Sequence, residues 1–281
     1  MVDHYELGND PACDEYLAST PEQEIIDGLT NAIEPEDYDE FLKSVHHALR
    51  RSIEIIESSA NRYYPFGEEE LNSLVAGLLV GQSFDASPEK NCRGNIDISV
   101  KNGDFKWNIE AKIGKTNNYI FEGLLQILTR YSTSEKDFGL LVYFKNKQPS
   151  IRFNEWCQYI DTAAWEDYST KNGILEQLRE CIPPGTTDSL YTTEPINNGM
   201  FAKRNMITSQ GCPINIQFVG VNLYYNPLDK SGRNGVGQKL FHAKESIQVE
   251  YLNHKHGNQV DLVKLMDSVG VLIENSADFK L

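Results

Sequence analysis

The chain has 281 residues, which is enough for one large domain or two small ones. It is 40% hydrophobic and 24% charged, as in globular proteins, and no apolar run approaches the roughly 18 residues of a membrane span. Its five cysteines form no C-x-x-C pair, and its N-terminal stretch lacks the apolar region of a signal peptide. We therefore expect a cytoplasmic protein with reduced thiols, no zinc site and no membrane partner.

The net charge of −15 is unevenly distributed along the chain. The first 40 residues hold thirteen acids and no Lys or Arg, which leaves 28 acids and 26 basic residues in the remainder. A nearly neutral body is compatible with binding phosphate, which the whole chain would repel. We expect the acidic region to mimic nucleic acid, cover a cleft or dock a basic partner. The alternative is a solvated helical segment that only improves solubility.

Residues 21–58 are predicted to be helical. Thr20 and Pro21 suit the N-cap and first position of a helix, and apolar residues then recur at helical spacing.

A further helix is predicted between Pro65 and Phe84. Its buried face is formed by Leu71, Leu74, Val75, Leu78 and Leu79. At about 100° per residue, Glu68 falls near the centre of that face, whereas Glu69 points away. We expect Glu68 to reach inward as an acid of a functional site. The alternative is that the acids at 68–70 only decorate the helix N-terminus, where the dipole favours negative charge.

Residues 94–114 alternate apolar and polar side chains, the pattern of two strands that each bury one face. Between the strands lies Asn102-Gly103, which is preferred in two-residue type I′ turns. With these residues as the loop, Ile98 faces Trp107, and the neighbouring facing pairs are also apolar on apolar. The pattern therefore predicts an antiparallel hairpin.

In this register Asp97 lies opposite Asn108 and diagonal to Glu110, roughly 7–8 Å away. Lys112 follows on the same face. Two carboxylates this close repel each other unless a cation lies between them, and oxygen ligands suit Mg²⁺ or Mn²⁺. A neighbouring lysine can orient water or stabilise charge during phosphoryl transfer. The alternative is a solvated polar face with an incidental Glu-Lys pair.

After the hairpin, residues 117–133 are predicted to form a helix that packs on the sheet, and residues 138–144 a buried strand. A strand, a helix and a second strand in this order form a plausible parallel crossover. Gln126 lies on the apolar side of the helix. A buried glutamine needs hydrogen-bond partners, and the nearest polar cluster is the one around Asp97.

The order Glu68, Asp97, Glu110-Ala111-Lys112 and Gln126, each on its expected element, resembles the PD-(D/E)xK, or restriction-endonuclease-like, nuclease superfamily. The resemblance covers residues 61–146 and is nearest to the Holliday-junction-resolvase and RecB-like branches. Two departures are visible: Ile96 replaces the proline before the Asp, and Arg130 occupies the position where RecB-like members often have Tyr, with Tyr131 following.

The resemblance implies an α/β fold with a restriction-endonuclease-like core, a mixed sheet flanked by helices. It implies that Asp97, Glu110 and the Ala111 carbonyl bind Mg²⁺ or Mn²⁺, with Lys112 at the attacking water and Glu68 and Gln126 as further catalytic residues. The expected function is a metal-dependent nuclease, on DNA more than RNA, as a regulated effector of a defence or repair system by analogy of fold. The rival hypothesis is a non-catalytic scaffold that docks a protein partner through its acidic N-terminus.

The expected organisation is an acidic helical extension at 1–60, the nuclease core at 61–150 and an α+β region at 151–281. In the last region the sequence predicts helices at 153–168 and 173–182 and a hairpin over 199–225. It also predicts a strand at 246–252, a helix at 260–269 and a strand at 270–274. The region is expected to extend the sheet, bind a regulator or form an oligomer interface. Basic residues expected around the site are Arg93, Lys101, Lys106, Lys112, Lys115 and Arg130.

Overall fold

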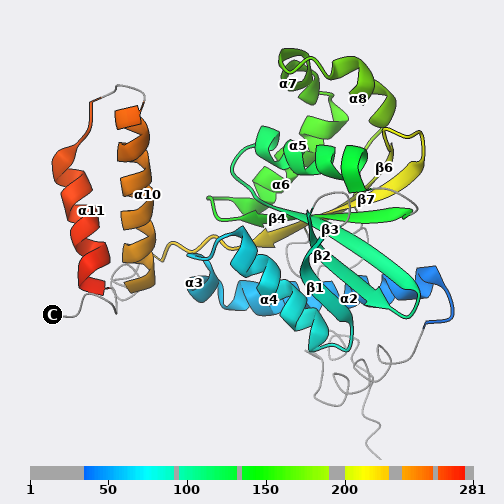
Figure 1. The fold of residues 1–281 in the computed structure, drawn as a ribbon, viewed down its shortest axis with the longest axis horizontal. Coiled ribbons are helices and arrows are strands. Elements are labelled where there is room, and N and C mark those ends of the chain that lie inside the picture. Colours follow the sequence, from blue (N-terminus) through cyan, green and yellow to red (C-terminus); the bar gives the residue numbers. More distant parts are fainter. Residues whose placement is uncertain are drawn as a thin grey trace, which may run out of the picture.

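The computed structural model describes residues 35–91, 95–131, 135–189, 200–227, 236–255 and 259–275. It shows a twisted sheet with helices on both faces and a separate helical hairpin at one side (Figure 1). Most of the expected acidic extension, residues 1–34, lies outside the described residues. None of the helices in the described ranges is long and apolar enough to cross a membrane.

The sheet has seven strands in the order β1-β2-β3-β4-β7-β6-β5. Their bounds are β1 (Asp85–Asn91), β2 (Asn95–Asn102), β3 (Phe105–Ile113), β4 (Asp137–Phe144), β5 (Asp188–Ser189), β6 (Phe201–Ile207) and β7 (Pro213–Asn222). The central strands β3, β4 and β7 are parallel, and the other pairs are antiparallel. The expected α/β fold with a mixed sheet is therefore confirmed.

Helices cover both faces of this sheet (Figure 1). One layer contains α2 (Tyr38–Ser58) and α4 (Glu68–Val80), joined by α3 (Ala60–Tyr63). The other contains α5 (Asn117–Gln126), the π-helical turn η2 (Ile127–Tyr131), α6 (Pro149–Asp161), α7 (Trp165–Lys171) and α8 (Leu175–Cys181). Strand β4 is buried along its whole length because alternate side chains enter the two cores. The β3-α5-β4 crossover follows the predicted order.

The β2-β3 hairpin forms, but the predicted turn was wrong by one residue. Gly103 and Asp104 make the loop, with Gly103 at a φ of 57°, and Asn102 pairs with Phe105. Ile98 therefore faces Ile109 rather than Trp107. Both registers pair apolar residues with apolar residues and keep every side chain on the same face, so the alternation could not distinguish them.

Strand β1 was not predicted, because its sequence DASPEKN lacks alternation and contains Pro88. It lies at the sheet edge, where proline is tolerated. In the C-terminal region the β6-β7 hairpin forms as predicted, and β7 lies beside β4. The sheet therefore continues across the boundary expected at residue 150.

The two strands predicted at 246–252 and 270–274 were wrong. Residues there lie in helices α10 (Val236–Lys255) and α11 (Leu262–Asn275). Both segments are short apolar or alternating runs, which periodicity alone does not separate from parts of longer helices.

Candidate active site

Strands β2 and β3 bring Asp97 and Glu110 together on the sheet face that α5 covers. The Cα pairing of β2 with β3 begins at Ile98 and Ile109 and puts Ser99, not Asp97, opposite Asn108. The Oδ2 atom of Asp97 accepts the backbone N–H of Ala111 at 2.7 Å. Asp97 therefore lies next to the Glu110-Ala111 stretch of β3 rather than opposite Asn108.

The N-terminus of α4 delivers Glu68 to the same place. Its Oε2 atom accepts the backbone N–H of Ile113 at 2.9 Å, which ties α4 to the end of β3. Glu70 instead accepts the N–H of Gly67 and caps the helix, and Glu69 is exposed. Of the three adjacent acids, the structure directs Glu68 to the site.

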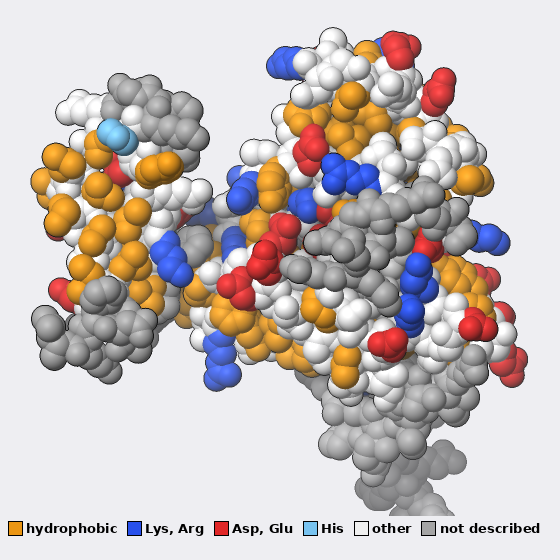
Figure 2. Space-filling view, in the orientation of Figure 1, with side chains coloured by type: hydrophobic (Ala, Val, Ile, Leu, Met, Phe, Trp, Pro, Cys, Tyr) orange, Lys and Arg blue, Asp and Glu red, His pale blue; other side chains and the backbone are white. Residues whose placement is uncertain are grey.

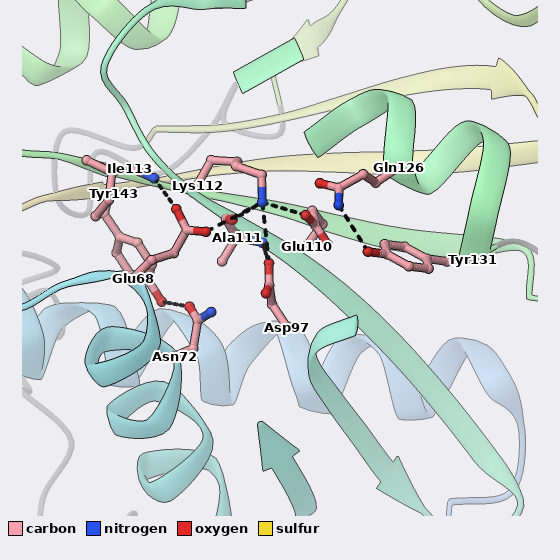
Figure 3. A network of polar contacts seen from close by, with 10 residues as sticks. All are labelled: Glu68, Asn72, Asp97, Glu110, Ala111, Lys112, Ile113, Gln126, Tyr131 and Tyr143. Atoms are coloured by element: carbon pink, nitrogen blue, oxygen red, sulfur yellow. Dashed lines mark hydrogen bonds and ion pairs between the residues drawn. The ribbon is translucent and has the colours of Figure 1, made fainter. Parts of the chain in front are cut away.

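Lys112 lies at the centre of these acids (Figure 3). Its Nζ atom is 2.5 Å from Glu110 Oε1, 3.5 Å from Glu68 Oε1 and 3.8 Å from Asp97 Oδ2. It also donates to the carbonyl oxygen of Ala111 at 2.9 Å. Three carboxylates from α4, β2 and β3 therefore converge on a single ammonium group.

The cluster contains three acidic side chains and one basic side chain. Burial raises the pKa of Asp97, although the Ala111 N–H and Lys112 oppose the shift. Burial, and then the charge of Asp97, raise the pKa of Glu110 more strongly. Burial alone would lower the pKa of Lys112, but Glu110, followed by Asp97 and Glu68, raises it. Lys112 therefore stays charged and leaves the carboxylates only partly compensated, and pKa values perturbed in this way are typical of functional sites.

Gly123 of α5 forms the wall above the Lys112 stem. A Cβ atom at this position would lie 2.9 Å from Lys112 Cγ and 3.2 Å from Leu140 Cδ1. The missing side chain therefore lets the buried lysine pass between α5 and the sheet. Sequence reasoning missed Gly123, because a glycine inside a helical pattern gives no indication of what packs against it.

Gln126 lies beside this cluster (Figure 3) and donates to the hydroxyl of Tyr131 at 3.3 Å. The structure thus gives Gln126 a partner other than the carboxylates. The hydroxyl of Tyr131 is part of the same environment: burial, and then the charges of Glu110 and Asp97, raise its pKa to about 12.

Tyr131 reaches this position because the chain is π-helical from Ile127 to Tyr131. A π turn places residue i+5 where an α-helix places i+4, and such turns are frequent at functional sites. Tyr131, five residues after Gln126, is therefore buried beside it, and Arg130 is exposed. Tyr131 was missed as a site residue because an α-helical period was assumed.

Several basic residues expected around the site lie elsewhere. Lys101 and Lys106 lie opposite each other in the strand register, near the turn of the β2-β3 hairpin. Lys106 is six residues from Lys112 along β3. Lys106 forms an ion pair with Glu135 there. Lys115 lies two residues after the end of β3, and its Nζ atom is 5.0 Å from the ring centre of Tyr119. Arg93 lies outside the described residues.

Within the described ranges, no group of three His, Cys, Asp or Glu side chains is arranged to hold a metal ion. The ammonium of Lys112 lies between the carboxylates instead. The donors themselves suit a hard cation, because Glu110 Oε2 is buried without a hydrogen-bond partner and the Ala111 carbonyl is adjacent.

Comparison of the chain with models of known protein families, with curated proteins and with solved structures found no match.

Proposed function

We propose that this protein is a Mg²⁺- or Mn²⁺-dependent nuclease with a restriction-endonuclease-like core, which hydrolyses phosphodiester bonds in nucleic acid, DNA more than RNA. The observation that carries the proposal is the convergence of Glu68, Asp97 and Glu110, from three separate elements, on Lys112.

The energetics of the cluster support a functional role. Taking these acids and the ammonium partly out of water costs several kcal/mol for each group that stays charged, and one ammonium cannot compensate three ionised carboxylates. The buried oxygen of Glu110 that lacks a partner adds to this cost. An apolar arrangement of similar volume would stabilise the fold at least as well, so stability does not account for these residues.

The proposed chemistry assigns each residue a task. Asp97, Glu110 and the Ala111 carbonyl would hold the metal, which when bound polarises the phosphate and lowers the pKa of a coordinated water. Lys112 would direct its ammonium at the negative charge that develops on the phosphoryl oxygens. Glu68 positions that ammonium from the opposite side.

Two exposed residues that follow Lys112 in the chain suit a nucleic-acid strand. Lys115 lies just before α5 and Tyr119 lies in its first turn, and both side chains are exposed. Lys115 follows Lys112 by three residues in the chain. The pKa of Tyr119 is raised by burial and then by Glu68, so the ring lies within the electrostatic reach of the site. A cationic side chain and an exposed aromatic ring offer a phosphate contact and a stacking surface for a base.

The second candidate is a non-catalytic scaffold with the same fold. The ion pair of 2.5 Å between Lys112 and Glu110 favours it, since a closed cluster can persist as a structural element. The two candidates differ in their response to metal, because a structural cluster gains nothing from Mg²⁺.

The test is a digestion of plasmid, single-stranded DNA and RNA with Mg²⁺ or Mn²⁺, each with and without EDTA. The wild type is compared with Asp97→Asn and with Glu69→Gln, an acid of the same region that is exposed. The proposal expects metal-dependent cleavage by the wild type and Glu69→Gln and none by Asp97→Asn. Cleavage that Asp97→Asn retains would assign the activity to a contaminant, and no cleavage of any substrate would favour the scaffold.

A further inference from the structure

The C-terminal hairpin of α10 and α11 is a defined unit beside the α/β body (Figure 1). The carboxylate of Glu250 in α10 contacts the start of α11: it accepts the N–H of Asp261 at 2.9 Å and lies 3.5 Å from Lys264 Nζ. Asn253 donates to the same carboxylate. The buried Glu250 therefore ties α10 to the start of α11.

That surface is strongly apolar and open to solvent. Leu262, Val263 and Met266 of α11 are 67%, 73% and 65% exposed, and Ile273 is 45% exposed. Tyr251 of α10 adds a ring that is 61% exposed. Figure 2 shows hydrophobic side chains gathered over the hairpin. Exposed residues of this size that adjoin one another mark an interaction surface more often than chance exposure.

The exposed residues of α11 include three with the spacing of a coiled-coil seam. Leu262, Met266 and Ile273, together with the half-buried Val269, follow the alternating four- and three-residue steps of heptad positions d, a, d and a. The charged residues of α11 all fall on outer positions: they are Lys264, Asp267 and Glu274. Leu265 and Leu272, which flank the seam, are half-buried. The helix thus has a second apolar face beyond the one that it needs within the hairpin.

We infer that this face binds a second copy of the chain, with α11 packed antiparallel against α11 of the partner in a two-fold four-helix bundle. A two-fold interface must be self-complementary, and an uncharged seam meets its own copy without placing a charge against an apolar residue or a like charge. Antiparallel pairing sets Leu262 against Ile273 and Met266 against Val269, so long and shorter side chains alternate.

The size of the surface agrees with a dimer. Side chains exposed to this degree contribute on the order of 100 Å² each, so the apolar set offers about 500 Å² per copy and about 1,000 Å² in total, which is about the least area expected of a biological interface. Gly270 lies on the flank of the seam, and a Cβ atom there would meet nothing within 4 Å. That open space is available to the partner helix.

The test is the mass of the full chain in solution, measured by light scattering behind size exclusion. The wild type should have twice the chain mass of 31.9 kDa, and Met266→Glu should have the mass of one chain with unchanged circular dichroism, because the side chain is exposed in the monomer. The matched control is Ile151→Glu, which changes an apolar residue that is 50% exposed on α6 and should remain dimeric.

The register has its own test. Val269→Lys should also be monomeric, and an equimolar mixture with Met266→Glu should recover a dimer, because positions 266 and 269 face each other across the axis. A monomeric wild type, or a dimer that persists in Met266→Glu, would overturn the inference. A mixture that stays monomeric would overturn the antiparallel pairing. None of these outcomes depends on nuclease activity.

Discussion

Replacing Gly123 by alanine tests whether the buried path of Lys112 depends on the missing side chain. Within a helix, Gly→Ala ordinarily stabilises by about 0.5–1 kcal/mol. At Gly123 the new Cβ would approach Lys112 Cγ to 2.9 Å and Leu140 Cδ1 to 3.2 Å. Overpacking of this kind costs about 1–3 kcal/mol. We therefore expect Gly123→Ala to lower the free energy of unfolding by about 1 kcal/mol and to displace the ammonium of Lys112.

The assays are urea unfolding and the initial rate of metal-dependent DNA cleavage, with Gly77→Ala of α4 as the control. A Cβ atom at Gly77 meets nothing within 4 Å, so this variant should be more stable than the wild type by about 0.5–1 kcal/mol and cleave normally. Gly123→Ala should lose about 10²-fold in rate, as when one transition-state donor is removed. A Gly123→Ala protein as stable as Gly77→Ala and as active as the wild type would refute the reasoning.

Three further predictions concern single side chains. Glu68→Gln should reduce the initial cleavage rate and Glu69→Gln should not, because Glu68 contacts Lys112 and Glu69 is exposed; the opposite ranking would show that another acid of α4 acts. Lys112→Ala should lose about 10²–10³-fold in rate but bind Mn²⁺ more tightly by calorimetry, because the ammonium no longer competes for the carboxylates; weaker binding would contradict this. Burial, and then Arg50 and Lys203, lower the pKa of His46 to about 4. The folded state therefore favours the neutral imidazole of His46. Its contribution to the free energy of unfolding is fully present above pH 6.5 and is lost as the pH falls towards 4. The unfolding free energy of the wild type should fall relative to His46→Gln by about 2–3 kcal/mol across that range, whereas parallel curves would show that His46 does not titrate as described.

Much of the fold could be predicted because it rests on local periodicity. The alternation of residues 94–114 predicts both strands and the face of each side chain, and the order of elements predicts the β3-α5-β4 crossover. The turn was wrong because both candidate registers satisfy the same apolar pairing. The helices α10 and α11 were partly mistaken for strands because short apolar runs in them have no period of their own.

The carboxylates and Lys112 could be named from the sequence, because each has a defined face on a predicted element. Gly123 and Tyr131 could not. The role of Gly123 depends on how closely α5 approaches β3, and the placement of Tyr131 depends on a π turn that shifts the helical phase by one residue. Both are consequences of packing, which no single element specifies.

The most direct test of the proposed function is the rate at which the wild type and Glu110→Gln cleave one end-labelled DNA duplex in Mg²⁺, with the two proteins purified in parallel. Glu110 contacts Lys112 at 2.5 Å and carries the buried oxygen that lacks a partner, so the substitution removes the proposed metal ligand and leaves the shape of the site. The account predicts cleavage by the wild type that EDTA abolishes, and a loss of at least about 10²-fold in Glu110→Gln. Equal rates for the two proteins, or no cleavage by the wild type, would contradict it.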